Sequence, residues 1–260
     1  MPCLEVTGLT AAELKRMGEQ DAMIIIPVGS MEQHGPHLPV MVDTRLATEV
    51  AMRTARKLTG LGETVLVAPA IWAGVSEHHM AFGGTISLRY AAFQAMAGDV
   101  IRSLARDGFR RICLLNGHGG NTAPLTVLVS ELTPELKIPL VSFTYWEIAG
   151  AAIREILEQQ EALLHACEAE TSMMMALEPR LVQRDHIAAA HCPDQEQAEV
   201  SNLVGPGVFR WQTIEARSRS GVIGNPATST AEKGARLLDA ISNRAAAILG
   251  TAELWSVRSY

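Results

Sequence analysis

Short apolar runs alternate along this chain with longer segments in which apolar residues recur three or four positions apart. A short apolar run bounded by turn residues is typical of a buried strand, and the longer period is that of an amphipathic helix. The pattern predicts strands over residues 23–28, 64–68, 111–115 and 140–144. It predicts helices over residues 11–19, 44–58, 90–107, 123–132, 147–164, 170–177 and 230–249. Alternating strands and helices indicate an α/β fold built on a mostly parallel sheet.

The length and composition indicate one folded unit. A chain of 260 residues allows one large domain or two small ones, and a hydrophobic content of 48% excludes a disordered protein. No proline- or serine-rich linker divides the sequence, and no internal repeat is visible. We therefore expect a single domain over residues 1–260.

The charge balance and the short apolar runs exclude two classes of partner. The chain carries 22 Lys and Arg against 28 Asp and Glu, a net charge of −6, and has no basic block. Nonspecific binding of nucleic acid needs a basic surface, so we expect no nucleic-acid partner. The strongly apolar runs, such as residues 23–28, are far shorter than the roughly 20 residues of a transmembrane helix, so we expect no membrane partner.

The N-terminus and the cysteines indicate a cytoplasmic protein. The first residues include Glu5 and Glu13 and show no basic segment followed by an apolar core, so we expect no signal peptide. The cysteines lack C-x-x-C spacing, which argues against a disulfide framework and against a thiolate zinc site. We expect reduced thiols at Cys3, Cys113, Cys167 and Cys192.

Candidate chemistry is concentrated in four connecting stretches rich in glycine, histidine and acidic residues. They cover residues 29–44, 74–85, 116–121 and 165–172, and six of the eight histidines lie in them. At least two of the stretches directly follow predicted strands, and ligands of open α/β sheets bind outside the carboxyl ends of the strands. A shared site at that edge of the sheet is the simplest explanation.

The first stretch offers mixed imidazole and carboxylate ligands. Glu32 and His34 are two residues apart, so on an extended segment both project to one side, and Asp43 follows nine residues after His34. This mixture suits Zn(II), Mn(II) or Fe(II) better than Ca(II) or Mg(II), which prefer oxygen ligands. The alternative is a surface loop in which Asp43 caps a helix that begins at Thr44.

The last two stretches add further histidines and carboxylates. His118 directly follows a buried strand and lies between glycines, which favours a ligand over a structural histidine. A phosphate-binding loop is disfavoured because no Lys or Ser/Thr completes it. His165 precedes Glu168 and Glu170 at the start of an apolar helical segment. Acidic residues are common in a first helical turn, which is the structural alternative for both glutamates.

Six segments, in this order, resemble the creatininase (creatinine amidohydrolase) family. They are PVGSMEQHGPHLP at residues 27–39, DT at 43–44, NGHGGN at 116–121, HACEAETS at 165–172, GVIGNP at 221–226 and AEKG at 231–234. The match spans nearly the whole chain, and its first segment is the most specific. The resemblance implies a three-layer α/β/α sandwich, a two-metal site, hydrolysis of an amide-type C–N bond and a homo-oligomer such as a hexamer.

The same resemblance implies how the ligands are shared. Glu32 and His118 would bind one divalent metal ion, His34 would bind the other, and Asp43 would bridge them. Zn(II) is the first candidate, with Mn(II) and Fe(II) as alternatives.

One ligand position departs from the family pattern. Creatininase has a glutamate two residues after the second histidine, where this sequence has Gly120. The substitute ligand is Glu170, which stands in the position of the glutamate in the family's Glu-Thr-Ser segment.

The resemblance, together with these residues, implies a metal-dependent amidohydrolase that acts on a small cyclic amide, a formamide or a short peptide. We class it with hydrolases of non-peptide or cyclic amide C–N bonds. His165 would pass a proton to the leaving nitrogen, because an unperturbed pKa near ~6.5 serves both directions at neutral pH. Glu168 would assist or orient it. Candidates for lining the pocket or contacting the ligands from outside are His37, Ser76, Glu77, His78, Gly119, Gly120 and Asn121. For Ser76, Glu77 and His78, a structural role is the alternative.

Creatinine itself is not the expected substrate. The resemblance would place a tryptophan just before the catalytic histidine, but residues 161–164 are Glu-Ala-Leu-Leu and the nearest upstream tryptophan is Trp146. The rival hypothesis is a non-catalytic metal- or ligand-binding protein on the same fold. A structural metal site is closed and has no spare acid–base group, so His165 and Glu168 favour the enzyme. An enzyme with one metal ion is a further variant.

Overall fold

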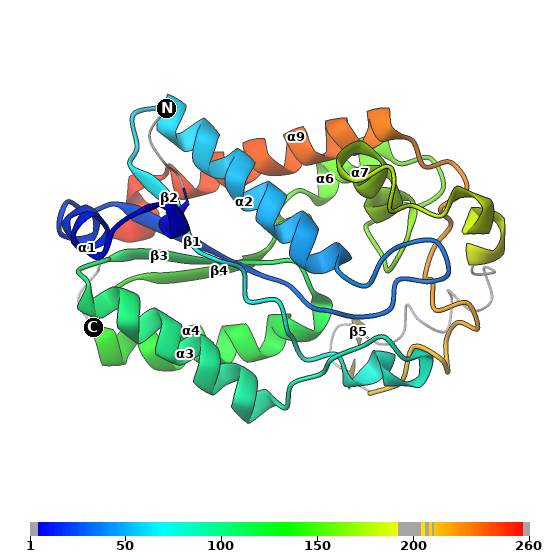
Figure 1. Ribbon diagram of the computed structural model, residues 1–260, viewed down its shortest axis with the longest axis horizontal. Coiled ribbons are helices and arrows are strands. Elements are labelled where there is room, and N and C mark those ends of the chain that lie inside the picture. Colours follow the sequence, from blue (N-terminus) through cyan, green and yellow to red (C-terminus); the bar gives the residue numbers. More distant parts are fainter. Residues whose placement is uncertain (1–4, 192–203, 206–207, 210, 257–260) are drawn as a thin grey trace.

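The computed structural model describes residues 5–191, 204–205, 208–209 and 211–256. Its centre is a parallel four-stranded sheet in the order β2, β1, β3, β4 (Figure 1). The strands are β1 (Met23–Val28), β2 (Val65–Val67), β3 (Arg111–Asn116) and β4 (Leu140–Thr144). β1 pairs with β3 along its whole length, with Met23 opposite Arg111 and Val28 opposite Asn116. The predicted strands and their parallel arrangement are confirmed.

Alternation along β1 builds two cores, because successive side chains of a strand point to opposite faces of the sheet. Met23 and Ile25 lie in the core on one face, and Ile24 and Ile26 lie in the core on the other. Every residue of β1 is buried, as expected for a central parallel strand that is covered on both faces. This explains why the strand is apolar without alternation in the sequence.

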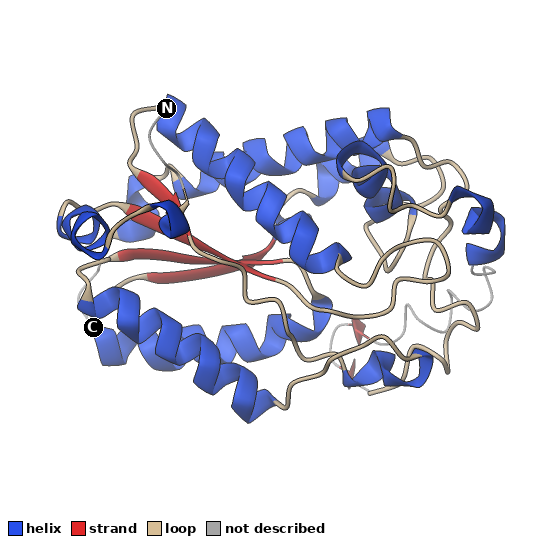
Figure 2. Ribbon diagram, viewed as in Figure 1, coloured by secondary structure: helices blue, strands red, loops and turns tan. Residues whose placement is uncertain are grey.

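Helices cover both faces of the sheet, which confirms the predicted three-layer α/β/α sandwich (Figures 1 and 2). One layer contains α2 (Val42–Gly60), α6 (Gly150–Ile156), α7 (Glu168–Leu177) and α9 (Ala231–Leu249). The other contains α3 (Tyr90–Arg106) and α4 (Thr122–Leu136). The first layer packs Leu46 and Leu237 into one core, and the second packs Phe93 and Leu128 into the other.

The predicted helix over residues 147–164 is wrong. The structure has α5 (Tyr145–Ile148) and α6 instead, and the backbone is extended at Leu157. The N–H groups of the next two residues donate to the carboxylate of Glu168 and not to the preceding helical turn. Because this acceptor comes from the start of another helix, the local period of the sequence does not reveal the break.

The remaining elements are short. α1 (Ala11–Glu19) begins with a capping box, in which Thr10 accepts the N–H of Glu13 and the Glu13 carboxylate accepts the N–H of Thr10. The others are η1 (Val6–Gly8), η2 (Glu77–Phe82), η3 (Gly119–Asn121), η4 (Arg184–Ala190), η5 (Ala252–Trp255), β5 (Val204–Gly205) and β6 (Val208–Phe209). Within the described ranges, no helix combines the length and the apolar character needed to cross a membrane.

Two of the four cysteines belong to the described residues. Cys113 and Cys167 are buried and free, in agreement with the prediction of reduced thiols. Burial raises the pKa of Cys167 to about 12, so this thiol is protonated at neutral pH. Cys3 and Cys192 lie outside the described residues.

The central strands end at one edge of the sheet, where long loops gather (Figure 1). Val28 and Asn116 are register partners, so the segments that follow β1 and β3 start side by side. Gly29 lets the first turn of α2 pass close to the end of β1, because a Cβ at this position would lie 2.5 Å from Cα of Thr44. This close approach brings Asp43 to the same edge.

Candidate active site

The predicted metal ligands come from four separate segments and meet at this edge. Glu32 and His34 follow β1, and Asp43 lies in the first turn of α2. His118 follows β3, and Glu170 lies in the first turn of α7. All five side chains are buried. The fold thus collects, in a small volume, residues that are up to 138 positions apart in sequence, from Glu32 to Glu170.

Three donor atoms form a first group. Nδ1 of His118 lies 3.1 Å from Oε2 of Glu32 and 3.0 Å from Oδ2 of Asp43. Oδ2 is buried and accepts no hydrogen bond from the described residues. A buried carboxylate oxygen without a donor is costly, whereas a cation among these three atoms would satisfy it. The donor set therefore fits a divalent metal ion of the kind bound by imidazole and carboxylate.

A second group uses the other oxygen of Asp43. Oδ1 lies 3.1 Å from Nε2 of His34, which lies 4.0 Å from Oε1 of Glu170. The second oxygen of Glu170 accepts the backbone N–H of Ala166, which leaves Oε1 turned toward His34. Asp43 therefore faces both groups, as a bridging ligand must. Because α2 begins at Val42, Asp43 lies inside the helix and does not act as its cap.

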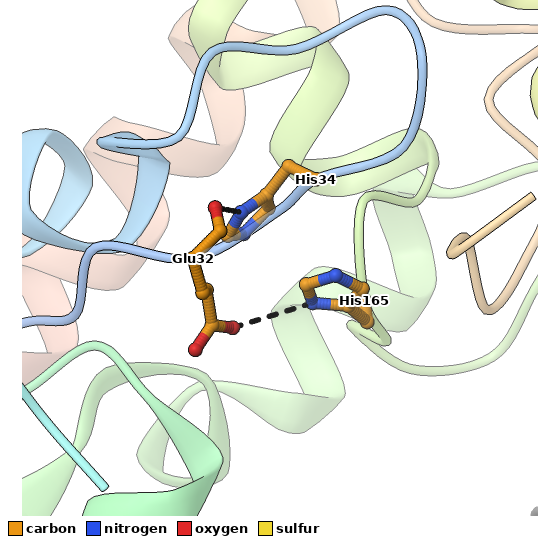
Figure 3. A group of neighbouring side chains, drawn as sticks. All are labelled: Glu32, His34 and His165. Atoms are coloured by element: carbon orange, nitrogen blue, oxygen red, sulfur yellow. Dashed lines mark hydrogen bonds and ion pairs between the residues drawn. The ribbon is translucent and has the colours of Figure 1, made fainter. Parts of the chain in front are cut away.

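Hydrogen bonds from outside orient the two histidines. Nε2 of His118 lies 3.0 Å from the carbonyl oxygen of Val75, and Nδ1 of His34 lies 3.1 Å from that of Glu32 (Figure 3). A carbonyl oxygen only accepts, so each of these nitrogens donates its N–H and the opposite nitrogen faces its donor group. Metal-binding histidines usually donate their other N–H in this way.

The buried charges shift one another's pKa. Burial alone lowers the pKa of His34, but the carboxylates of Asp43 and Glu170 outweigh it and raise the pKa to about 9. Burial also lowers the pKa of His118, and the Glu32 and Asp43 carboxylates raise it well above its ordinary value. Burial raises the pKa of Glu170 to about 8, although the positive charge of His34 opposes the shift. The cluster therefore binds protons strongly, and a metal ion must compete with them.

His165 reaches the site from the loop before α7 (Figure 3). Its Nε2 lies 2.9 Å from the carbonyl oxygen of Gln33, and its Nδ1 lies 3.7 Å from Oε1 of Glu32. Nε2 therefore donates to the carbonyl, and Nδ1 faces the carboxylate. Burial and the charge of His34 lower the pKa of His165 well below its ordinary value, so the ring is neutral. A neutral imidazole here can accept a proton or bind a cation with Glu32 and His34.

The turn that carries His165 has a strained backbone. Ala166 has φ 52°, in the left-handed region that residues with a Cβ seldom adopt. Its N–H bonds to Glu170, and the carbonyl of His165 accepts the N–H of Ile223 at 2.8 Å. These bonds hold the turn in place, and strain of this kind is typical of functional sites.

Two residues that contact the predicted site residues directly, His79 and Gln33, were not predicted. Nε2 of His79 lies 3.1 Å from Oε1 of Glu32, and its Nδ1 lies 2.9 Å from Nε2 of Gln33. Nε2 of Gln33 also donates to the carbonyl of Gly221. The sequence signals were the His-His pair at residues 78–79 and the glutamine inside the most specific segment. Neither signal shows that the two side chains meet each other, or that His79 contacts Glu32.

Of the candidate residues in the stretch 74–85, Ser76 and His78 lie at the site and Glu77 lies at the surface. Oγ of Ser76 donates to Oε2 of Glu32 at 2.7 Å and lies 3.1 Å from Nε2 of His118, so it supports two predicted ligands. His78 lines the cavity next to them. Glu77 is exposed and is not among the described residues that form the cavity wall.

Two other predicted pocket residues hold the surrounding loops. Nε2 of His37 lies 2.7 Å from Oγ1 of Thr171, which joins the first loop to α7. The carboxamide of Asn121 accepts the N–H of Val75 and donates to the carbonyl of Gly29. Both side chains stabilise the loops and do not belong to the cavity wall of the described structure.

Gly119 lines the cavity, and Gly120 explains the altered ligand position. A Cβ at Gly120 would collide with the carbonyl oxygen of Val75 and lie 2.5 Å from Nε2 of His118. No glutamate fits there without moving these groups. Glu170 supplies the carboxylate to the second donor group from α7 instead.

Glu168 is placed differently from the expectation that it assists or orients His165. Its carboxylate is buried and lies 2.6 Å from Nζ of Lys233. It also accepts the N–H groups of Glu158 and Gln159, and it does not line the cavity of the described structure. Glu168 therefore holds α7 against α9 and against the loop that contains Glu158 and Gln159.

A cavity of about 200 Å³ opens beside the donor groups. This volume is below the roughly 300–1,000 Å³ of sites for drug-sized ligands, so it suits a small substrate or one end of a longer substrate. Trp146, Leu163 and Leu164 form an apolar part of its wall. The full wall consists of Glu32, Asp43, His78, His79, Gly117, His118, Gly119, Trp146, Leu163, Leu164, His165, Glu170, Ile214, Arg217 and Ile223.

Known proteins are similar to this chain in sequence and in fold. A mycofactocin precursor peptide peptidase of Mycobacterium ulcerans is 35% identical over 218 residues, which cover 82% of this chain and 79% of the relative. A creatinine amidohydrolase of Pseudomonas putida is 31% identical over 188 residues, which cover 66% of this chain and 70% of the relative.

Solved structures agree with these relatives. A crystal structure of creatinine amidohydrolase (creatininase) has a TM-score of 0.81 and 28% identity, and covers 96% of this chain and 98% of its own. A Zn–Zn type creatininase mutant and a creatininase described as Mn each have a TM-score of 0.79 and 28% identity. They cover 96% and 95% of this chain, and 98% and 97% of their own chains.

The family model for creatinine amidohydrolase matches residues 7–249. That range contains every strand of the central sheet and all five predicted metal ligands. The chain belongs to the creatininase family of metal-dependent amidohydrolases.

Proposed function

We propose that this protein is a two-metal hydrolase that cleaves an amide C–N bond. The observation that carries the proposal is the position of Asp43, whose two carboxylate oxygens face separate buried donor groups beside a cavity. Glu32 and His118 would hold one divalent ion with Asp43, and His34 and Glu170 would hold the other. Zn(II) is the first candidate and Mn(II) the second, supported by the solved relatives, and Fe(II) suits the same donors.

The bound ions would activate a water molecule and polarise the substrate carbonyl. His165 would take up a proton at Nδ1 and pass it to the leaving nitrogen. The carbonyl of Gln33 holds the Nε2–H of this ring, so Nδ1 stays turned toward the reacting groups. Trp146 and Leu164 would exclude bulk water from one side of the cavity.

A short peptide is the first substrate class that we propose. The support comes from the mycofactocin precursor peptide peptidases, which are 30–35% identical to this chain over 79–88% of their own length. A small cyclic amide or a formamide is the second class, supported by the creatinine amidohydrolase relative and by the small cavity. The peptide relatives thus change the order that the sequence suggested, in which non-peptide and cyclic amides came first.

The test combines metal analysis with a hydrolysis screen. Protein stripped by a chelator and dialysed is reloaded with Zn(II), Mn(II) or Fe(II) and assayed on short peptides, formamides and creatinine. We expect two ions per chain and hydrolysis only after reloading. Full activity with one ion per chain would support the one-metal variant. Binding of ions at both groups without hydrolysis of any amide would instead support a non-catalytic metal-binding protein.

We also propose a cytoplasmic location, a single domain over residues 1–260 and a homo-oligomeric state. The reduced thiols support the cytoplasmic location, and the absence of a linker in the sequence supports the single domain. The family resemblance, which suggests a hexamer, supports the homo-oligomer. The expected partner is a small-molecule or peptide substrate. Light scattering coupled to size-exclusion chromatography measures the mass of the assembly directly.

A further inference from the structure

Arg217 lies on the cavity wall, in a short turn that is tied to His78. The N–H of Ile214 donates to the carbonyl of His78 at 2.8 Å, and the N–H of Arg217 donates to the carbonyl of Ile214 at 2.9 Å. Arg217 is the one arginine or lysine among the residues that form the described cavity wall.

The guanidinium of Arg217 has donors to spare. Nη2 donates to the carbonyl of Gln212 at 3.1 Å, but Nε is buried and has no acceptor among the described residues. Arg45, Arg102 and Arg111 each place a nitrogen 2.7–2.8 Å from a carboxylate oxygen. Within the described ranges, Arg217 has no such partner. An unpaired, partly buried guanidinium is costly, so an anion that enters the cavity is bound favourably.

The other residues of the cavity wall indicate which chemical groups the substrate carries beside its anionic group. The metal donor groups lie on one part of the wall, and Trp146 and Leu164 form an apolar part. A substrate that fills the cavity would therefore meet the metal donors, the apolar Trp146 and the positive Arg217 within one small volume. One guanidinium matches one carboxylate well, because its planar N–H pairs fit both oxygens.

We propose that Arg217 binds a carboxylate of the substrate and makes the enzyme selective for amides that carry a free carboxylate. This inference deepens the proposed amide hydrolysis and rests on it. Arg217 is not one of the metal donors, so recognition of the substrate charge and bond cleavage would use different residues.

The test compares two probes that differ only in this group. Binding of N-acetyl-leucine and of N-acetyl-leucinamide to the zinc-loaded protein is measured by calorimetry. We expect the wild type to bind the acid about 10–100-fold more tightly. Arg217→Gln is expected to reduce this preference to less than about twofold. Arg217→Lys retains part of it, because the charge remains while the two-pronged geometry is lost.

Arg219→Gln is the matched control, because Arg219 is an exposed arginine two positions away, and it is expected to keep the wild-type preference. Thermal melting of each variant confirms that it folds. Equal binding of the two probes by the wild type overturns the inference. A full preference in Arg217→Gln also overturns it, since the metal ions would then be binding the carboxylate. The proposed function fails separately, if the metal-loaded protein hydrolyses no amide, charged or neutral.

Discussion

Nζ of Lys233 lies 2.6 Å from Oε1 of Glu168, in a buried ion pair that joins the start of α9 to the start of α7. The same carboxylate accepts the backbone N–H groups of Glu158 and Gln159. One side chain therefore anchors the loop that leads to His165. Glu168 affects the site by positioning this loop.

Glu168→Ala is expected to destabilise the protein by about 2–3 kcal/mol. Removing one member of a buried ion pair usually costs about 3–5 kcal/mol, but Lys233 keeps a second carboxylate, that of Glu158, at 2.9 Å. Urea unfolding measures the change. The control is Glu161→Ala, an exposed glutamate in the same loop, which should stay within about 0.5 kcal/mol of the wild type. Equal stability of the two variants would contradict the anchoring role.

Asp43→Asn is expected to abolish turnover and to lower the metal content of both donor groups while the fold is kept. An amide offers one neutral oxygen where the two groups need two negatively charged oxygens. Elemental analysis and a hydrolysis assay measure the two effects. Asp239→Asn, which changes an exposed aspartate paired with Lys57, serves as the control. Full activity of Asp43→Asn with unchanged metal content would remove Asp43 from the site.

Glu170→Gln and His165→Ala are expected to fail in different ways. Glu170 faces His34 at 4.0 Å and completes the second donor group, so Glu170→Gln should reduce the number of ions bound per chain. His165→Ala should keep the ions and lose about 10²–10⁴-fold in rate, the usual contribution of a general acid or base. The loss should be smaller for substrates whose leaving group needs no proton. If His165→Ala releases metal and Glu170→Gln does not, the two roles are exchanged.

The metal-free protein is expected to lose stability as the pH rises from about 6.5 to 9. The pKa of His34 is raised from 6.5 to about 9, so its contribution to stability is complete below pH 6.5 and is lost as the pH rises through 9. The pKa of Glu170 is raised from 4.5 to about 8, so its contribution disappears in the same direction. Melting temperatures of chelator-treated protein across this range measure the trend.

The metal-loaded protein should show the opposite trend, because its ligands bind metal only when deprotonated. Occupancy is therefore expected to fall on acidification, and the melting temperature gained from Zn(II) should grow as the pH rises. If the melting temperature of the metal-free protein instead increases between pH 6.5 and 9, protons do not occupy the cluster around His34 and Glu170.

Creatinine is expected to be a poor substrate or none. Leu163 and Leu164 lie on the cavity wall just before His165, in place of the tryptophan that the family resemblance would call for. Trp146 does reach the same wall, so the cavity retains one indole, from a different segment. Steady-state kinetics decides the point: a kcat/KM for creatinine at or above about 10⁴ M⁻¹s⁻¹, within the ordinary enzymatic range, would refute this prediction.

The sequence predicted the strands and helices correctly where the local pattern of apolar residues reflects which faces of an element are buried. β1 is a continuous apolar run because both faces of a central parallel strand are buried, and α9 has a helical period because only one of its faces is. The helix predicted over residues 147–164 failed for the opposite reason. The carboxylate of Glu168 competes for backbone N–H groups there, and local periodicity contains no trace of it.

By itself the sequence determined the α/β fold with a mostly parallel sheet and the types of residue that can bind metal, because strand period, helix period and ligand chemistry are local properties. Only the tertiary structure decided how these residues are used. It turned the two oxygens of Asp43 toward different histidines, added His79 beside Glu32, and bound Glu168 to Lys233, a partner 65 positions away. Such contacts depend on how helices and loops pack across the sheet, and this packing joins residues whose separation along the chain carries no signal.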